Sequence, residues 1–180
     1  NIVCPVCGGQ LALFGNKKLS DGVLCRNCAG KVSEWIGDDT LASWNIKRVQ
    51  DHLDYRQKNQ EALERFQPVR DYGDLWKIHE DDDGHFLVSK SSDWRKKNPD
   101  IISWDEVIKA KDSVRMEGEG YDVFVNIETN DPEVTKMNIR VNEFPGLSVG
   151  SEEYKKALND ARALTKFVNS RIAERRKDDE

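Results

Sequence analysis

The chain has 180 residues, of which 34% are charged and 37% hydrophobic, and its formal net charge is −5. This composition predicts a modest core beneath a highly solvated surface, in one medium domain or two small ones. The sequence contains no apolar run near the roughly 20 residues that a bilayer-spanning helix needs, and no signal-peptide pattern. We therefore expect a cytoplasmic protein. The chain begins with Asn1 rather than Met, and we expect a few residues to precede it in the native protein.

The distribution of charge disfavours a nucleic-acid surface. Residues 70–150 hold 18 acidic and 11 basic side chains, and residues 1–40 hold four of each sign. The last 30 residues hold eight basic and seven acidic side chains. None of these segments has the basic field that phosphate binding requires. Nucleic acid is therefore the less favoured class of partner.

Two Cys-x2-Cys pairs, Cys4 with Cys7 and Cys25 with Cys28, stand 17 residues apart near the start of the chain. Each turn brings two thiolates to one ion, and two turns close a tetrahedral four-sulfur shell that leaves no position for a substrate. The spacing predicts a zinc ribbon that holds one structural Zn²⁺. Two disulfides in a secreted domain are the alternative. Cys-x2-Cys turns favour metal over cross-links geometrically, and we expect a reducing compartment.

The ribbon is predicted to contain short strands over 10–14 and 23–24, with a turn at 18–22. A segment of about 30 residues cannot bury enough apolar surface alone, so the metal is expected to supply its folding free energy. One long helix is predicted over 40–66, with Thr40 as its N-cap and Pro68 beyond its end. The middle of this helix is polar all round, which is typical of a helix that bridges two domains with only its ends buried.

From residue 69 onward the hydrophobic pattern changes to a period of two. The alternation predicts an antiparallel meander in which Asp83 and Gly84 turn the first hairpin, and residues 115–120 are predicted as a loop. The five or so predicted strands are 75–79, 85–88, 101–111, 121–128 and 136–142. Ser151 is a good N-cap for a last helix over 150–176. The apolar stripe of that helix would lie on the sheet or close one mouth of it.

Several stretches of the chain carry a resemblance to known families. They are Cys4 to Gly8, 18–22, Cys25 with Cys28, 55–59, 66–68, 98–103 and 121–125. Over nearly its whole length the chain resembles a bacterial domain-of-unknown-function family that joins a four-cysteine ribbon to a helix and a C-terminal β domain. This resemblance implies zinc binding by the four cysteines.

The β half, with its final apolar-striped helix, also looks like a PH-like or GRAM-like barrel, in which the last helix plugs an open end. That resemblance implies lipid or protein binding by analogy. Phosphoinositide-binding PH domains place a Lys/Arg cluster at the early hairpin, whereas residues 80–83 here are all acidic. An anionic head group would be repelled.

The sequence thus predicts an α+β protein with three parts. These are a zinc ribbon over 1–37, a linking helix over 38–68, and a PH-like antiparallel β meander or partial barrel with a C-terminal helix over 69–180. Catalysis is not expected, because the ribbon uses all four cysteines, only three histidines exist, and no glycine pattern forms a phosphate-binding loop.

A polar loop in the β half holds Trp94 beside Arg95, Lys96 and Lys97, a local combination of an aromatic ring with three positive charges. Such a patch could contact a protein, a membrane surface or a single strand. The alternative is an indole folded back onto the β domain, with the cations solvated.

We predict a non-enzymatic zinc-binding interaction module or adaptor that recognises a macromolecular partner, with protein favoured. A nucleic-acid- or transcription-associated ribbon and a peripheral membrane adaptor acting through the PH-like domain are the alternatives.

Overall fold

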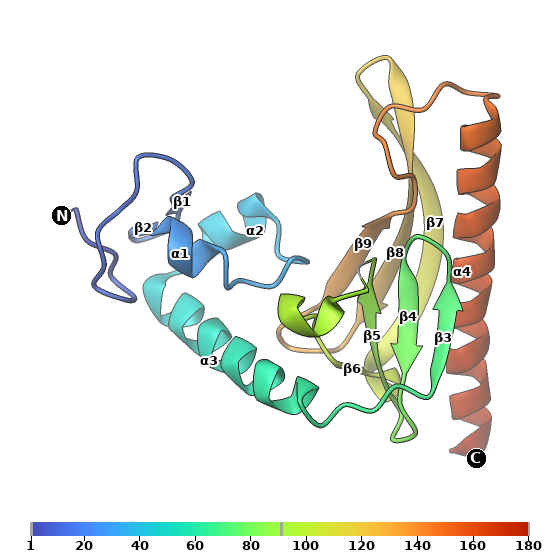
Figure 1. Cartoon of the computed structure of the whole chain (residues 1–180), viewed down its shortest axis with the longest axis horizontal. Helices are drawn as coiled ribbons and strands as arrows, with labels where there is room; N and C mark the ends of the chain where they lie inside the picture. Colours follow the sequence, from blue (N-terminus) through green and yellow to red (C-terminus); the bar gives the residue numbers. More distant parts are fainter. Residues whose placement is uncertain (1, 91, 180) are drawn as a thin grey trace. The chain divides into compact units, whose positions relative to one another are not determined.

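The structure, a computed structural model, describes residues 2–90 and 92–179 (Figure 1). The chain divides into two compact units that combine helices with antiparallel sheets. The first, here called the N-terminal unit, comprises 1–65 and 98–100, and the second, called the β unit, comprises 66–97 and 101–180. The predicted three-part division, with boundaries at 37 and 68, stays a prediction.

The N-terminal unit contains a two-stranded ribbon and three helices. These are β1 (Lys17–Lys18), β2 (Val23–Leu24), α1 (Arg26–Ala29), α2 (Asp38–Ser43) and α3 (Ile46–Leu63). Three of the cysteines pack with Leu19, Leu24, Leu41 and Val49 in one buried cluster. The ribbon and the two longer helices therefore share a core.

The predicted strand over 10–14 is wrong. In this stretch Gln10 forms one isolated antiparallel bridge with Val3, and the first strand begins only at Lys17. The reason is Asn16, whose side chain bonds to both the N–H and the carbonyl oxygen of Ala12 and closes residues 12–16 into a loop.

The single helix predicted over 40–66 is also wrong, because the chain forms two helices. Trp44 and Asn45 have extended ψ angles of 144° and 173°, and the Asn45 side chain accepts a hydrogen bond of 2.8 Å from Arg48 N. An asparagine that caps a helix in this way starts a new one. Gly37, not Thr40, is the N-cap of α2.

The middle of α3 is buried on one face, which corrects the expectation that only the helix ends would be covered. The buried positions recur at helical spacing: Val49, His52, Arg56, Asn59 and Leu63. Several of these side chains are polar, and their partners are described below.

The β unit contains two antiparallel sheets whose strands follow chain order. The four-stranded sheet consists of β3 (Arg70–Gly73), β4 (Lys77–Glu80), β5 (His85–Ser89) and β6 (Ile102–Ser103). The three-stranded sheet consists of β7 (Val107–Glu117), β8 (Gly120–Thr129) and β9 (Lys136–Arg140). Two short 3₁₀ helices, η1 (Trp94–Lys97) and η2 (Trp104–Glu106), lie between β5 and β7 in the chain.

The first predicted hairpin is confirmed: β4 pairs with β5 across a turn in which Gly84 has a φ of 82°. The predicted loop over 115–120 is wrong, because β7 continues to Glu117 and pairs Met116 with Tyr121 of β8. The chain reverses at Gly118, whose φ of 60° suits glycine. β3 was not predicted, and η2 interrupts the strand expected over 101–111, so that β6 and β7 are separate strands.

The C-terminal helix α4 (Glu152–Asp178) begins at Ser151, as predicted, and Ser151 Oγ accepts a hydrogen bond of 3.1 Å from Tyr154 N. Asn169 bonds to both the N–H and the carbonyl oxygen of Ala110 in β7, at 3.0 Å each. Figure 1 shows α4 running along β7 and β3. In the described part of the chain the strands form separate sheets rather than a closed barrel, and the PH-like assignment stays a prediction.

Within residues 2–90 and 92–179, no helix combines the length and the apolarity that crossing a membrane would demand.

Candidate metal centre

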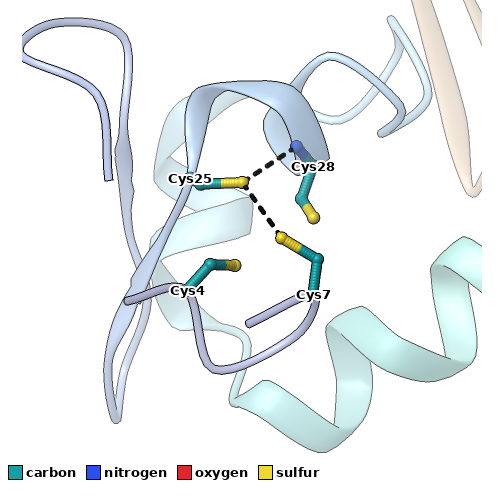
Figure 2. Close-up of side chains that lie close together, drawn as sticks. All are labelled: Cys4, Cys7, Cys25 and Cys28. Carbon is teal, nitrogen blue, oxygen red and sulfur yellow. Dashed lines mark hydrogen bonds between the residues drawn. The ribbon is translucent and has the colours of Figure 1, made fainter. Parts of the chain in front are cut away.

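Four cysteine side chains converge in the N-terminal unit, where Figure 2 shows their sulfur atoms pointing toward one another. All four sulfur atoms lie within 4.8 Å of one another, and the Sγ atoms of Cys7 and Cys25 lie 3.7 Å apart. A tetrahedral zinc ion with bonds of about 2.3 Å places its sulfur ligands about 3.8 Å apart. The cluster that the spacing predicted therefore has dimensions compatible with a zinc site.

Two tight turns position the sulfur atoms. In the first, Cys4 N donates to Gly9 O at 2.7 Å and Gly8 N donates to Cys4 O at 2.8 Å, and Gly8 has a φ of 74° that suits glycine. In the second, Cys25 is the N-cap of α1, and its sulfur accepts a hydrogen bond of 3.3 Å from Cys28 N. Local backbone hydrogen bonds thus orient the two sulfur atoms of each pair toward one point.

Backbone N–H groups also donate to two of the four sulfur atoms. Gly9 N donates to the sulfur of Cys7 at 3.3 Å, matching the bond from Cys28 N to Cys25. N–H donors to metal-bound ligands hold their orientation and tune their basicity. Such donors are expected around thiolates and are consistent with metal ligands.

The crowding of four thiols changes their pKa values. Burial opposes ionisation of Cys4, but bonds from backbone N–H groups, that of Cys25 foremost, outweigh it and lower the pKa of Cys4 to about 6. Burial and the neighbouring Cys25 and Cys7 side chains raise the pKa of Cys28 above its ordinary value. One sulfur is therefore ready as a thiolate at neutral pH, whereas ionisation of all four needs a cation among them.

The residues present fit a zinc ion. Three of the four cysteines are buried, and Cys7 is exposed at one side. Four thiolates would saturate a tetrahedral zinc ion, which is the arrangement of structural rather than catalytic zinc. Bound at this place, the ion would stabilise the ribbon fold.

The predicted partner-binding residues lie in η1 of the β unit. Trp94 is buried, its indole packs edge-on against Phe66 with ring centroids 6.0 Å apart, and the His79 ring lies 5.3 Å away. Arg95 donates to Phe66 O at 2.9 Å, while Lys96 and Lys97 are exposed. The structure thus turns the aromatic ring inward and leaves cations on the surface, and partner binding by this segment stays a prediction.

A buried polar cluster in the N-terminal unit was not predicted. It joins two stretches that carried the family resemblance, 55–59 and 98–103. Asn59 Nδ2 donates to Asn98 Oδ1 and to Pro99 O, at 2.8 Å each, and Asn98 Nδ2 donates to Arg56 O at 3.0 Å. Asn98 has a φ of 52°, a left-handed conformation that asparagine tolerates. Polar residues at helical spacing within α3 were the signal that could have indicated a buried network.

Comparison with known proteins covers the N-terminal part of the chain. Residues 2–52 match the family model described as Domain of unknown function (DUF4428). The matched region is under a third of the chain and includes all four cysteines. No curated protein and no solved structure matches the chain. The similarity therefore supports a domain of unknown function with a four-cysteine cluster, and the β unit lies outside it.

Proposed function

We propose that this chain is a non-enzymatic zinc-binding interaction module that recognises a protein partner through the tip of its ribbon. The observation that carries the proposal is the exposure of two consecutive apolar side chains. Leu13 is 92% exposed and Phe14 is 81% exposed. Single exposed apolar residues are ordinary, whereas contiguous exposed apolar surface supports a role in interaction.

The tip, residues 12–16, is held in one shape. Asn16 Oδ1 accepts hydrogen bonds from Ala12 N at 3.1 Å and from Arg26 N at 3.2 Å, and Asn16 Nδ2 donates to Ala12 O at 2.6 Å. Arg26 directly follows the metal-site residue Cys25. A loop ordered before binding loses little conformational entropy when a partner docks, which favours affinity.

Zinc has a supporting role in this proposal. The ion would hold Cys25, and through the adjacent Arg26 it would fix the base of the tip. A saturated four-thiolate shell offers no open position for a substrate, which supports a binding role over catalysis. Four thiolates also require a reducing compartment, so we place the protein in the cytoplasm.

The β unit is included in the proposal as a PH-like or GRAM-like domain. Antiparallel strands followed by one helix with a buried apolar stripe are the order of elements that this resemblance implies. A bacterial origin is implied only by the resemblance of the whole chain. The acidic β4–β5 turn, with Asp82 and Asp83 exposed, favours a protein partner over an anionic lipid for this unit as well.

A capture experiment from native lysate tests the proposal with a matched pair of variants. The first is the double variant Leu13→Ser, Phe14→Ser, and the second is Met116→Ser, which removes an apolar side chain that is 72% exposed from the β7–β8 hairpin. We expect a protein bound by the wild type to be lost from the first variant and kept by the second. Zinc content measured on each sample verifies that the ribbon is intact.

The captured protein would then be purified, and its dissociation constant for each variant measured directly. Equal affinity for wild type and the double variant would refute recognition by the tip. Nuclease-sensitive nucleic acid in the eluate would favour the transcription-associated alternative. Co-sedimentation with liposomes that is lost when Arg95, Lys96 and Lys97 are neutralised would favour the membrane adaptor.

A further inference from the structure

The β unit carries a groove between helix α4 and the loops that follow β3 and β9. Two adjoining hollows of about 280 Å³ and 410 Å³ share four lining residues, Asp74, Leu75, Val141 and Asp160. Sites for small side chains and ligands begin at about this volume. Apolar side chains line much of the groove: Leu75, Trp76, Val141, Phe144, Leu147, Ala157 and Leu164.

The walls of the groove are tied together by contacts within the β unit. Tyr72 OH donates to Ala163 O at 3.2 Å, and the Tyr72 ring stacks on Phe167 with centroids 4.1 Å apart. Trp76 Nε1 donates to Arg140 O at 2.9 Å. These contacts join β3, the β3–β4 turn, β9 and α4, so the walls of the groove are held together by the fold of the β unit itself.

One end of the groove presents an exposed aromatic ring on an ordered turn. Phe144 is 71% exposed. Its carbonyl oxygen accepts a hydrogen bond of 2.8 Å from Asn142 Nδ2, and the nearby Gly146 N donates to the buried carboxylate of Asp122 at 2.8 Å. These two hydrogen bonds hold the turn in place, and the exposed ring of Phe144 is available to pack against an apolar side chain of a ligand.

The rim of the groove is acidic and already holds a cation. Asp74, Glu143, Glu153 and Asp160 line it with Lys156 as the one basic residue in the lining. Lys156 Nζ lies 3.0 Å from Asp74 Oδ2 and 2.7 Å from Asp160 Oδ2. This ammonium group occupies a seat between two carboxylates, one on the β3–β4 turn and one on α4, and the three side chains are 62%, 76% and 39% exposed for Lys156, Asp74 and Asp160.

We propose that this groove binds an extended segment of a partner protein in which apolar side chains alternate with Lys or Arg. The apolar lining would receive Leu-like side chains, and a partner cation would replace the Lys156 ammonium between Asp74 and Asp160. The four carboxylates outnumber Lys156 and the adjacent Arg140, whose guanidinium donates to Asn142 O and Glu143 O. The remaining negative charge favours a basic segment over anionic lipids and nucleic acids. The inference goes beyond the ribbon tip, since the groove lies wholly in the β unit.

Three labelled hexapeptides test the chemistry of the occupant. The first is acetyl-Gly-Leu-Arg-Leu-Lys-Gly-amide, the second replaces Arg and Lys by Glu, and the third replaces both Leu by Ser. Binding to the full chain is measured by fluorescence anisotropy, and the indole N–H resonance of Trp76 reports contact with the groove. We expect saturable binding of the first peptide and a shift of that resonance, with neither effect from the other two.

Matched variants distinguish binding in the groove from a general effect of the negative charge of the protein. Asp74→Asn and Asp160→Asn should each lower the affinity for the first peptide about twofold to fivefold. Lys156→Met should raise that affinity by a similar factor, because it removes the ammonium group that competes for the two carboxylates. Lys155→Met and Glu152→Gln alter charge equally on the same helix, where these two residues pair with each other. We expect them to leave the affinity nearly unchanged.

Each alternative result overturns the proposal. Equal effects of Lys155→Met and Lys156→Met would mean that the peptide senses only net charge. If the peptide with Ser in place of Leu bound as tightly as the first peptide, the apolar lining would have no role in recognition. If no peptide bound, the proposed class of occupant would be excluded. Failure here would leave the ribbon tip untouched, because the Leu13 and Phe14 variants are measured separately.

Discussion

Arg56 and Asp100 form a buried ion pair, with Arg56 Nη1 3.0 Å from Asp100 Oδ1 and side chains that are 8% and 1% exposed. The same carboxylate accepts hydrogen bonds from Tyr55 OH at 2.6 Å and Ser33 Oγ at 2.7 Å. Arg56 Nε also donates to Lys31 O at 2.8 Å. The pair therefore connects α3 with the chain that follows the cysteine cluster and with the segment 98–100.

Removing one member of this pair is expected to destabilise the N-terminal unit strongly. Asp100→Ala leaves the Arg56 charge buried without its carboxylate, which typically costs about 3–5 kcal/mol. The control is Asp51→Ala, which breaks an exposed pair with Lys47 of similar length, 2.8 Å, and should cost less than about 1 kcal/mol. Urea unfolding followed by tryptophan fluorescence gives both free energies, and similar values for the two variants would contradict the expectation.

Loss of one sulfur ligand is expected to abolish zinc binding. Cys4→Ser or Cys28→Ser should reduce bound zinc to none per chain and unfold residues 1–31, because the metal supplies folding free energy to so small a ribbon. The β unit should keep its antiparallel sheets. Metal analysis and circular dichroism check both statements, and a variant that retained one zinc ion per chain would disprove the four-thiolate site.

Zinc affinity is expected to increase with pH. The raised pKa of Cys28 means that this thiol keeps its proton at neutral pH and must release it to bind zinc. Cys4, with a pKa of about 6, is already ionised above that pH and takes up a proton below it. The slope of affinity against pH should therefore become steeper as the pH falls through 6. Competition with a chelator at a series of pH values measures it, and a constant affinity would contradict this expectation.

Trp94 is expected to stabilise the β unit, whatever partner its neighbours bind. Trp94→Ala removes an indole packed against Phe66 and should lower the free energy of unfolding by about 3–5 kcal/mol. The controls are Lys96→Gln and Lys97→Gln on the same 3₁₀ helix, which should leave stability nearly unchanged because both side chains are exposed. Thermal unfolding distinguishes these outcomes, and the lysine variants also serve in a liposome co-sedimentation assay of the membrane alternative.

Local signals predicted the parts of the fold that depend on neighbouring residues. The cysteine spacing predicted the cluster, Ser151 predicted the start of α4, and Gly84 predicted the first hairpin. The break at Asn45 was missed because the apolar spacing of Leu41 and Val49 continues across it as if one helix were present. β3 was missed because the polar strand Arg70–Gly73 has no alternating apolar pattern.

Contacts between residues distant in the sequence could not be predicted. Nothing in the local sequence distinguishes Ser33, Arg56 or Asp100 from an exposed polar residue. Only the fold brings them together. The groove likewise combines the β3–β4 turn, the loop after β9 and helix α4, so no single stretch of sequence could predict it. The exposure of Leu13 and Phe14 depends on Asn16, whose hydrogen bonds turn an apolar stretch outward that would otherwise fit a strand.

The segment 98–100 belongs to the N-terminal unit although the chain has by then supplied residues 66–97 to the other unit. During synthesis, α3 leaves the ribosome well before Asp100 does, so Arg56 lacks its counter-ion until residue 100 has been made. The N-terminal unit is consequently unable to complete its interior as an early, independent step of cotranslational folding. A protein cut after residue 65 would carry every cysteine and the whole matched region, yet its Arg56 would face an interior without the carboxylate that neutralises it.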